Sequence, residues 1–278
     1  MELVNSATRA LTRKGLADSS KPTADGSFLR VSSIGNCIRQ QIYDGLRAPV
    51  EAGNPDTAAN GLVAREIGNT LHSQVQCAME TDPVFEKFRS EVRVSFPEVM
   101  RSGHADGVYL WFHNKFGKFQ GRICVVEIKT MRNFAFRKAR KEGPREQHLL
   151  QAATYALGLN VHAVHMVYIC TDATPGKWKD QAKAGDTIEW VYELDDRVEE
   201  SGATLRTITE YVLEMEMRET ITALQTGVVP LGLKGSGGSG DTPWECGYCS
   251  YRKLCESPEG DSISSILRIK EKDNESVS

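Results

Sequence analysis

One short strand constrains this chain more than any other segment, because it carries two charges inside an apolar run. The residues at 124–128 and their neighbours, C-V-V-E-I-K, have the composition of a buried strand. Glu127 and Lys129 are two residues apart, so they project from the same face of such a strand. Burying these charges without partners costs several kcal/mol, so a strand that keeps them is expected to use them.

The preceding strand offers a partner for Glu127. The polar, glycine-containing turn between the two strands centres between Phe116 and Gly117. In an antiparallel hairpin about that centre, Asp106 stands opposite Glu127 on the same side of the sheet. A bulge would shift this register by one residue.

Two carboxylates that converge in this way suggest a metal site. Hard oxygen ligands suit Mg²⁺ or Mn²⁺. A cationic Lys129 beside Asp106 and Glu127 can orient an attacking water or neutralise charge on a phosphoryl transition state. The alternative is a structural ion pair between Glu127 and Lys129 on an edge strand.

The remaining pattern predicts an α/β protein. Hydrophobic residues make up 40% of the 278 residues and charged residues 26%, which is ordinary globular composition. Helices are expected from 3.6-residue periodicity and strands from alternation. The expected helices span residues 32–46, 57–80, 145–157 and 197–224, and the expected strands span 91–96, 108–112, 123–128, 161–170 and 187–194.

Composition also predicts the domain limits. Residues 1–28 are polar and are expected to form a loose arm, and residues 235–240 are a flexible linker by composition. The acidic segment 257–278 is expected to be a disordered tail, which leaves one domain over residues 29–256. The net charge of −3 excludes a uniformly basic nucleic-acid coat but allows a local basic groove.

Membrane and export signals are not expected in this sequence. The longest apolar run falls short of the roughly 20 residues that span a bilayer, and the N-terminus lacks the apolar core of a signal peptide. Seven cysteines without an export signal argue against a disulfide framework. The expected class is a soluble, cytoplasmic protein.

Three motifs follow one another along the chain: G-H-A-D at 103–106, E-I-K at 127–129 and Q-A-A-T-Y at 151–155. This series resembles the RecB-like branch of the PD-(D/E)xK nucleases, whose pattern is G-x-x-D, E-x-K and Q-x-x-x-Y. The resemblance implies a restriction-endonuclease-like fold, with a mixed sheet flanked by helices. It also implies that the acids bind metal, the lysine assists phosphodiester hydrolysis, and the Gln and Tyr support substrate and lysine. The implied catalytic residues are Asp106, Glu127, Lys129, Gln151 and Tyr155.

The same family has a histidine that can join the metal, placed after a glycine on a helix. The segment G-N-T-L-H at 68–72 matches that placement. The resemblance then implies one or two Mg²⁺ or Mn²⁺ ions held by His72, Asp106, Glu127 and the carbonyl of Ile128. His148 is interpreted as an ordinary surface or core residue.

A cysteine cluster near the end of the chain predicts a second metal site. Cys246, Cys249 and Cys255 lie within ten residues, and thiolates this close usually bind a soft metal. Three ligands need a fourth, and Cys37, in polar surroundings at the start of a helix, is the best candidate. The other cysteines lie in apolar periodic segments and are expected to be inert core residues; they are Cys77, Cys124 and Cys170.

The cysteine spacing favours iron–sulfur over zinc. Structural zinc sites usually pair their ligands as two close couples, whereas here a lone cysteine precedes C-x₂-C-x₅-C. The pattern resembles the CRISPR-associated Cas-four exonucleases and the nuclease domains of AddAB-type helicase–nucleases, over about residues 30–256. It implies a four-iron (4Fe-4S) cluster that staples the fold. The family often has proline where this chain has Ile38 and Leu254, and zinc or no metal remain alternatives.

A basic stretch begins two residues beyond Lys129. Residues 131–145 carry six cations against one acid, with phenylalanines between them. Cations beside stackable rings suit a DNA single strand, and the alternative is an ordinary solvated loop and helix start. The candidate DNA contacts are Arg132, Phe134, Phe136, Arg137, Lys138, Arg140, Lys141 and Arg145.

Together these features predict a metal-dependent DNA exonuclease that acts on single strands or DNA ends. The resemblance implies a role in recombination, repair or CRISPR spacer acquisition, with recombination or CRISPR-adaptation proteins as candidate partners. One alternative is a catalytically silent DNA-end binding or assembly module that keeps the fold. The other is a structural zinc-binding interaction protein.

Overall fold

A computed structural model describes residues 27–50, 55–85, 87–115, 118–173, 182–198, 202–233 and 243–277. It shows an α/β protein with a mixed sheet and flanking helices. The chain divides into two compact units. The sheet unit holds residues 65–96 and 102–211, and the cysteine unit holds 1–64, 97–101 and 212–278. The single domain expected over 29–256 spans both units. None of the described helices combines the length and the apolar character needed to cross a membrane.

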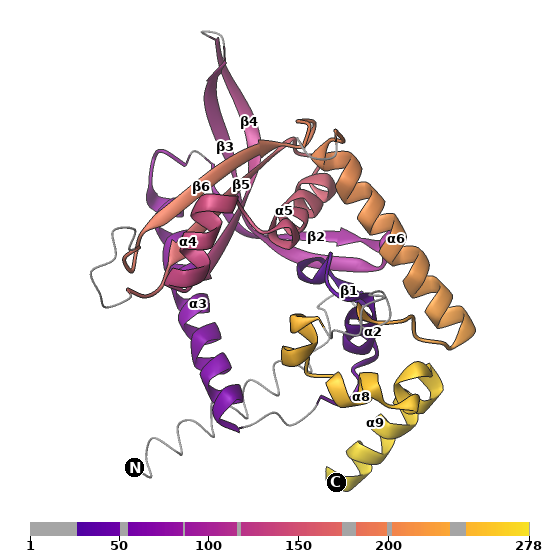
Figure 1. Cartoon of the computed structure of the whole chain (residues 1–278). Coiled ribbons are helices and arrows are strands. Elements are labelled where there is room, and N and C mark those ends of the chain that lie inside the picture. The colour runs from indigo at the N-terminus through magenta and orange to yellow at the C-terminus, as the bar shows by residue number, and fades with distance from the viewer. Residues whose placement is uncertain are drawn as a thin grey trace, which may run out of the picture. The chain divides into compact units, whose positions relative to one another are not determined.

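The sheet unit is built on a sheet in which β4 and β5 are parallel, whereas the pairs β3–β4 and β5–β6 are antiparallel. β2 pairs with β3, and the order then runs β3, β4, β5 and β6. β5 is buried along its whole length, as a central strand with a parallel neighbour requires. In Figure 1 the β3–β4 hairpin extends well beyond the other strands. The strands are β2 (Arg89–Phe96), β3 (Arg101–Lys115), β4 (Lys118–Met131), β5 (Ala163–Cys170) and β6 (Thr187–Glu193).

The β3–β4 hairpin has the predicted register. Gly107 stands opposite Val126 and Lys115 stands opposite Lys118, so the hairpin centres between residues 116 and 117. Continued by one residue, the same register sets Asp106 opposite Glu127. Both strands are longer than predicted, because cross-strand pairing continues through residues that the sequence assigned to a turn.

Helices cover both faces of this sheet. α5 (Glu146–Gly158) packs on β4 and β5, and its completely buried alanines, such as Ala152 and Ala156, permit close contact. From Arg65 onward, α3 (Pro55–Thr81) supplies Met79 to a cluster with Val126 and Ile128, on the other face of β4. α4 (Asn133–Glu142) follows β4 directly. Glu127 and Lys129 therefore share the face of β4 that lies toward α5, where Lys129 contacts Gln151, and Val126 and Ile128 face α3.

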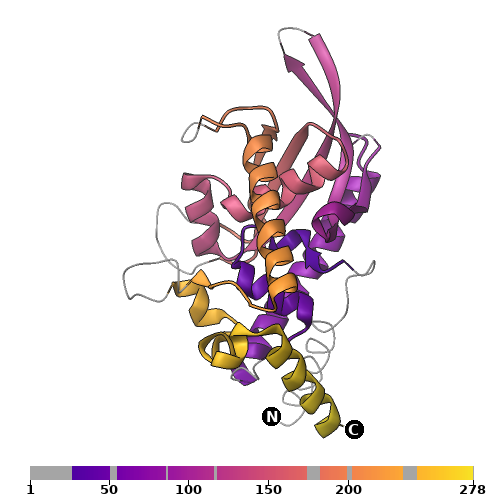
Figure 2. The same cartoon turned by 90° about the vertical axis from the view of Figure 1, so that its right-hand side faces the viewer.

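The cysteine unit consists mainly of short helices. Its core joins Ile42 and Tyr43 of α2 to Tyr251 and to Ile266 of α9. α9, yellow in Figures 1 and 2, packs against α2, although the two lie at opposite ends of the described chain. The elements are β1 (Leu29–Arg30), η1 (Val31–Ser33), α2 (Ile38–Leu46), η2 (Pro97–Val99), the part of α6 (Leu205–Thr226) from Val212, η3 (Trp244–Tyr248), α8 (Arg252–Glu256), η4 (Pro258–Asp261) and α9 (Ile263–Val277).

The expectation of a disordered tail over 257–278 is wrong. Ile263–Val277 forms α9, in which Ile266 is completely buried, and Lys270 Nζ donates to the carbonyl of Leu46. The acidic composition concealed an apolar stripe at helical spacing, and that stripe docks on the core of the cysteine unit.

Two helix starts also differ from expectation. The segment 32–46 begins as the 3-10 turn η1 and becomes α-helical only at Ile38, because the Ser33 hydroxyl bonds the Arg30 carbonyl and does not cap a helix. α6 begins at Leu205 and not at 197, because Arg197 forms a bridge with Thr204. The linker at 235–240 and nearly all of the arm at 1–28 lie outside the described residues.

Candidate metal centre and cysteine cluster

Asp106 of β3 is fixed between α3 and β4. Its Oδ2 lies 2.8 Å from Nε2 of His72 and accepts a 2.6 Å hydrogen bond from the backbone N–H of Ile128. α3 comes close to β4 here because residue 68 is glycine: a Cβ on Gly68 would lie 3.0 Å from Oγ1 of Thr130. Burial by itself lowers the pKa of His72, but the hydrogen bond and charge of Asp106 outweigh it and raise that pKa.

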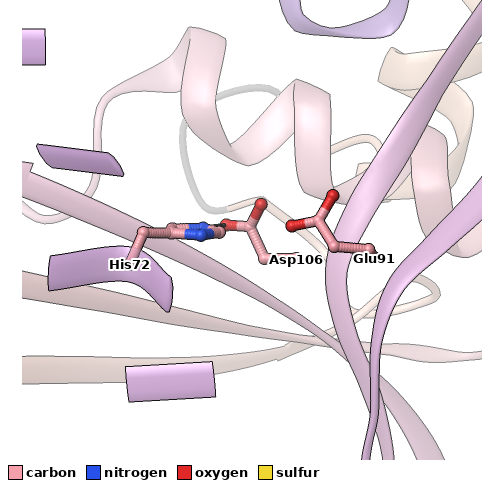
Figure 3. A group of neighbouring side chains, drawn as sticks. All are labelled: His72, Glu91 and Asp106. Carbon is pink, nitrogen blue, oxygen red and sulfur yellow. Dashed lines mark ion pairs between the residues drawn. The ribbon is translucent and has the colours of Figure 1, made fainter. Parts of the chain in front are cut away.

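Glu91 of β2 belongs to the same cluster, and sequence reasoning missed it. Ligand atoms of His72, Glu91 and Asp106 all lie within 4.8 Å of one another. Figure 3 shows the three side chains in a row, with Asp106 in the middle. Glu91 has a φ of +51°, which is rare for a residue other than glycine. Its carboxylate accepts a 2.8 Å bond from Gln76, whose amide also donates to the Asp106 carbonyl at 2.7 Å.

Glu127 is completely buried opposite this cluster. Its Oε1 lies 2.6 Å from Nζ of Lys129, while Oε2 has no hydrogen-bond partner in the described part of the chain. Burial raises the pKa of Glu127, and the charge of Asp106 raises it further against the opposing pull of Lys129. A bound cation would supply the partner that this buried carboxylate oxygen lacks.

Lys129 is held from both sides. Besides its ion pair with Glu127, its Nζ donates to Oε1 of Gln151 at 3.1 Å, and Gln151 bonds the Tyr155 side chain. Burial by itself lowers the pKa of Lys129, but the ion pair with Glu127 outweighs it and raises that pKa. Gln151 and Tyr155 are both buried, and of the two it is Gln151 that contacts the lysine through a hydrogen bond.

His148 lies one turn before Gln151 and has a bonding pattern of its own. Its Nδ1 lies 2.7 Å from the hydroxyl of Tyr168, and that hydroxyl accepts a 3.0 Å bond from the backbone N–H of Arg145. Burial, with the charges of Lys129 and Arg145, lowers the pKa of His148 to about 3. It is a neutral, hydrogen-bonded residue of the α5–β5 contact.

The four cysteines that were expected to bind iron line one cavity in the cysteine unit. Their thiols are half-buried and form no disulfide. Cys37 comes from the residue before α2, and the other three come from the segment of η3 and α8. A Cβ on Gly232 would lie 3.6 Å from Sγ of Cys255 and 3.7 Å from Sγ of Cys37, so these thiols share one patch of backbone. The remaining ligand candidates are Cys246 and Cys249.

The other three cysteines only partly match expectation. Cys124 and Cys170 are buried, as predicted, but Cys77 is exposed. α3 buries Met79 in the apolar cluster, with Val75 packed against it, and a residue midway between these two points away from the sheet.

The basic segment forms α4, and its two phenylalanines differ. Phe134 is 82% exposed, whereas Phe136 is completely buried, because residues two apart on a helix face opposite sides. Phe136 therefore cannot stack on a base, and that part of the prediction is wrong. Instead, the guanidinium of Arg140 lies over its ring at 5.1 Å.

The cations of this segment divide in the same way. Arg140 lies 3.6 Å from Asp186, and Lys138 lies 3.6 Å from Glu142 one turn along α4. Arg137 is half-buried. The cations that are exposed and make neither of these ion pairs are Arg132, Lys141 and Arg145.

Comparison with known proteins adds only a general likeness. The sequence matches no protein-family model, and the search of curated proteins found no match. Among solved structures the chain is similar to one described as "Crystal structure of SSO0001", with a TM-score of 0.48 and 16% sequence identity. That match covers 92% of this chain and 96% of the other. The assignments that follow therefore stand on the geometry of the two sites.

Proposed function

We propose that this protein is a metal-dependent deoxyribonuclease of the RecB-like PD-(D/E)xK type, acting as an exonuclease on single-stranded DNA or DNA ends. One observation carries the proposal: residues from α3, β3 and β4 meet at one point of the sheet unit, in the hairpin register that their motifs predict. Recombination, repair or CRISPR spacer acquisition are the processes that the resemblance implies.

The donor set fits Mg²⁺ or Mn²⁺. Asp106 and Glu127 supply carboxylate oxygens, one of which is buried without a hydrogen-bond partner, and His72 adds an imidazole nitrogen. Glu91 adds a third carboxylate within reach of His72 and Asp106. The carbonyl of Ile128 is a further ligand by resemblance. When bound, the metal would supply a Lewis acid and would make a bound water more acidic.

Lys129 acts in this scheme as a cation and not as a base. Its pKa is raised, so it keeps its proton at neutral pH and cannot accept one from water. Glu127 and Gln151 both hold Nζ in place. A fixed ammonium of this kind stabilises negative charge on the phosphoryl group as the transition state forms.

α4 is the proposed approach for DNA. It follows β4 directly after Lys129, exposes the ring of Phe134 and carries a surplus of cations. Exposed cations contact phosphates and an exposed ring stacks on a base. We assign the DNA contacts to Arg132, Phe134, Arg137, Lys138, Arg140, Lys141 and Arg145.

We propose that the four cysteines hold a 4Fe-4S cluster that staples the cysteine unit. The sequence pattern supports iron–sulfur over a single zinc ion, because a lone cysteine precedes C-x₂-C-x₅-C, whereas structural zinc sites usually pair their ligands as two close couples. All four thiols line one cavity of the cysteine unit, which fits a group that takes a ligand from each of them.

End-labelled single and double strands, incubated with Mn²⁺ or with EDTA, test the proposed activity. We expect the wild type to degrade DNA with Mn²⁺ and not with EDTA. Lys129→Ala should lose about 100- to 1,000-fold in rate, the usual cost of one transition-state donor. DNA binding without metal-dependent cleavage would replace the proposal with the catalytically silent DNA-end binding module.

A further inference from the structure

Arg39 is a buried cation beside the cysteine cavity. It is 2% exposed, follows Cys37 by two residues and lines the same cavity as the four thiols. A Cβ on Gly232 would lie 3.3 Å from Cδ of Arg39, and nearly as close to the sulfurs of Cys37 and Cys255. The stem of the arginine and two of the thiols therefore meet over one glycine.

The far end of the guanidinium is already satisfied by protein partners. One Nη donates to the Pro230 carbonyl at 3.1 Å. The other donates to the Asp261 carboxylate at 2.6 Å and, at 3.5 Å, to the carbonyl of Cys255. The ring of Tyr43 lies 5.4 Å from its centre. These contacts tie α2 to the segments before and after the cysteine cluster.

The Nε–H of Arg39 is different, because it is buried and has no hydrogen-bond partner in the described part of the chain. Leaving a buried donor unpaired costs free energy, so native proteins rarely keep one without a use. We propose that this N–H donates to a sulfur of the iron–sulfur group held by Cys37, Cys246, Cys249 and Cys255, and that Arg39 thereby controls how tightly the group is retained and how easily it is reduced.

The charge of Arg39 acts in the same direction as its hydrogen bond. Four thiolates and the cluster sulfides place negative charge in a half-buried cavity, and reduction adds one more electron. A guanidinium that never loses its proton lowers the cost of that added charge. The reduction potential should therefore be higher with Arg39 than without it. This inference rests on the proposed cluster and does not depend on the proposed nuclease activity.

Three variants of the full chain, purified without oxygen, test the role of Arg39. Arg39→Met removes the charge and the Nε–H, and Arg39→Lys keeps the charge but loses that donor. Asp261→Asn is the matched control. It weakens the ion pair between Arg39 and Asp261, whose side chain is 64% exposed, and it leaves the Nε–H of Arg39 in place. The measurements are iron per chain, competition with a chelator, the potential of the cluster from a redox titration followed by electron paramagnetic resonance, and circular dichroism for the fold.

We expect Arg39→Met to lower the affinity for iron by about 10- to 100-fold, the usual cost of losing an outer-shell partner of a metal site, and to shift the potential to more negative values. Arg39→Lys should fall between Arg39→Met and the wild type, and Asp261→Asn should match the wild type. If Arg39→Met fails to fold, the potential of Arg39→Lys decides. If the Arg39 variants keep the potential and the chelator resistance of the wild type, the role of Arg39 is overturned but the cluster is not. A wild type that purifies without iron would overturn the cluster as well.

Discussion

The two candidate sites are held together by different kinds of structure. In the sheet unit, a hydrogen-bonded hairpin fixes the acids, and each functional side chain has a protein partner: His72 with Asp106, and Lys129 with Glu127. In the cysteine unit, the thiols come from two helices of five residues, from the residue that follows the first of them, and from the residue before α2. The first site is therefore expected to keep its fold without metal, whereas the second is expected to need the proposed cluster in order to fold.

The largest effect should come from removing a thiol ligand. Cys246→Ser should cost about 5 kcal/mol of stability or more, in the range of mutations that lose a metal, because binding of the group is also folding free energy. Iron analysis and thermal denaturation measure both losses. Cys77→Ser, at an exposed thiol outside the cavity, is the control and should change neither. A colourless Cys246→Ser protein with full stability and activity would remove the contrast between the two units.

Variants of the ion pair between Lys129 and Glu127 on β4 can separate an effect on stability from an effect on the proposed catalysis. Lys129→Met leaves Glu127 buried and uncompensated, which should cost about 3–5 kcal/mol. Adding Glu127→Gln in the same chain should restore most of that stability, because the unpaired charge is gone. Neither variant should cleave DNA. Urea denaturation and the nuclease assay measure the two properties, and a double variant with near-normal activity would make the pair purely structural.

Metal affinity at the carboxylate site should depend on pH, because protons compete with the metal for its ligands. The pKa of Glu127 is raised above 4.5 and that of His72 above 6.5, and both groups must be deprotonated to bind metal. Raising the pH through these values removes the competing protons, so metal affinity should increase, by about tenfold per pH unit for each proton released. Titration calorimetry with Mn²⁺ in buffers of different ionisation enthalpy counts those protons. An affinity that stays constant with pH would argue against both ligands.

The smallest effect should come from the exposed ring on α4. Phe134→Ala should leave stability unchanged, because the ring is 82% exposed, and should weaken single-strand binding by about 1–3 kcal/mol. Fluorescence anisotropy with a labelled oligonucleotide measures this loss. Tyr211→Ala removes another exposed ring, 66% accessible on α6, and should bind like the wild type. An equal loss of single-strand affinity in both variants would show that DNA binding does not depend specifically on α4.

The parts of this protein that follow a short-range rule could be predicted from the sequence. The alternation on β3 and β4 and their glycine-containing turn determine the register that sets Asp106 opposite Glu127. The spacing of Cys246, Cys249 and Cys255, with Cys37 as the expected fourth ligand, predicts that the four thiols come together, and all four line one cavity.

The remaining features depend on contacts that a linear pattern does not contain. Glu91 reads as an ordinary polar residue of an alternating strand, and only its positive φ and the bond from Gln76 bring it to His72. Phe136 could be distinguished from Phe134 only once the start of α4 was known. The charge of the last segment concealed the buried Ile266.

Anomalous diffraction from crystals soaked in Mn²⁺ tests the central claim most directly. The account predicts a peak in the sheet unit bonded to Nε2 of His72 and to carboxylate oxygens of Asp106 and Glu127, with Nζ of Lys129 close by. If this position stays empty at saturating Mn²⁺, or if Mn²⁺ binds only at other carboxylates, the assignment of these residues to a hydrolytic metal centre is contradicted.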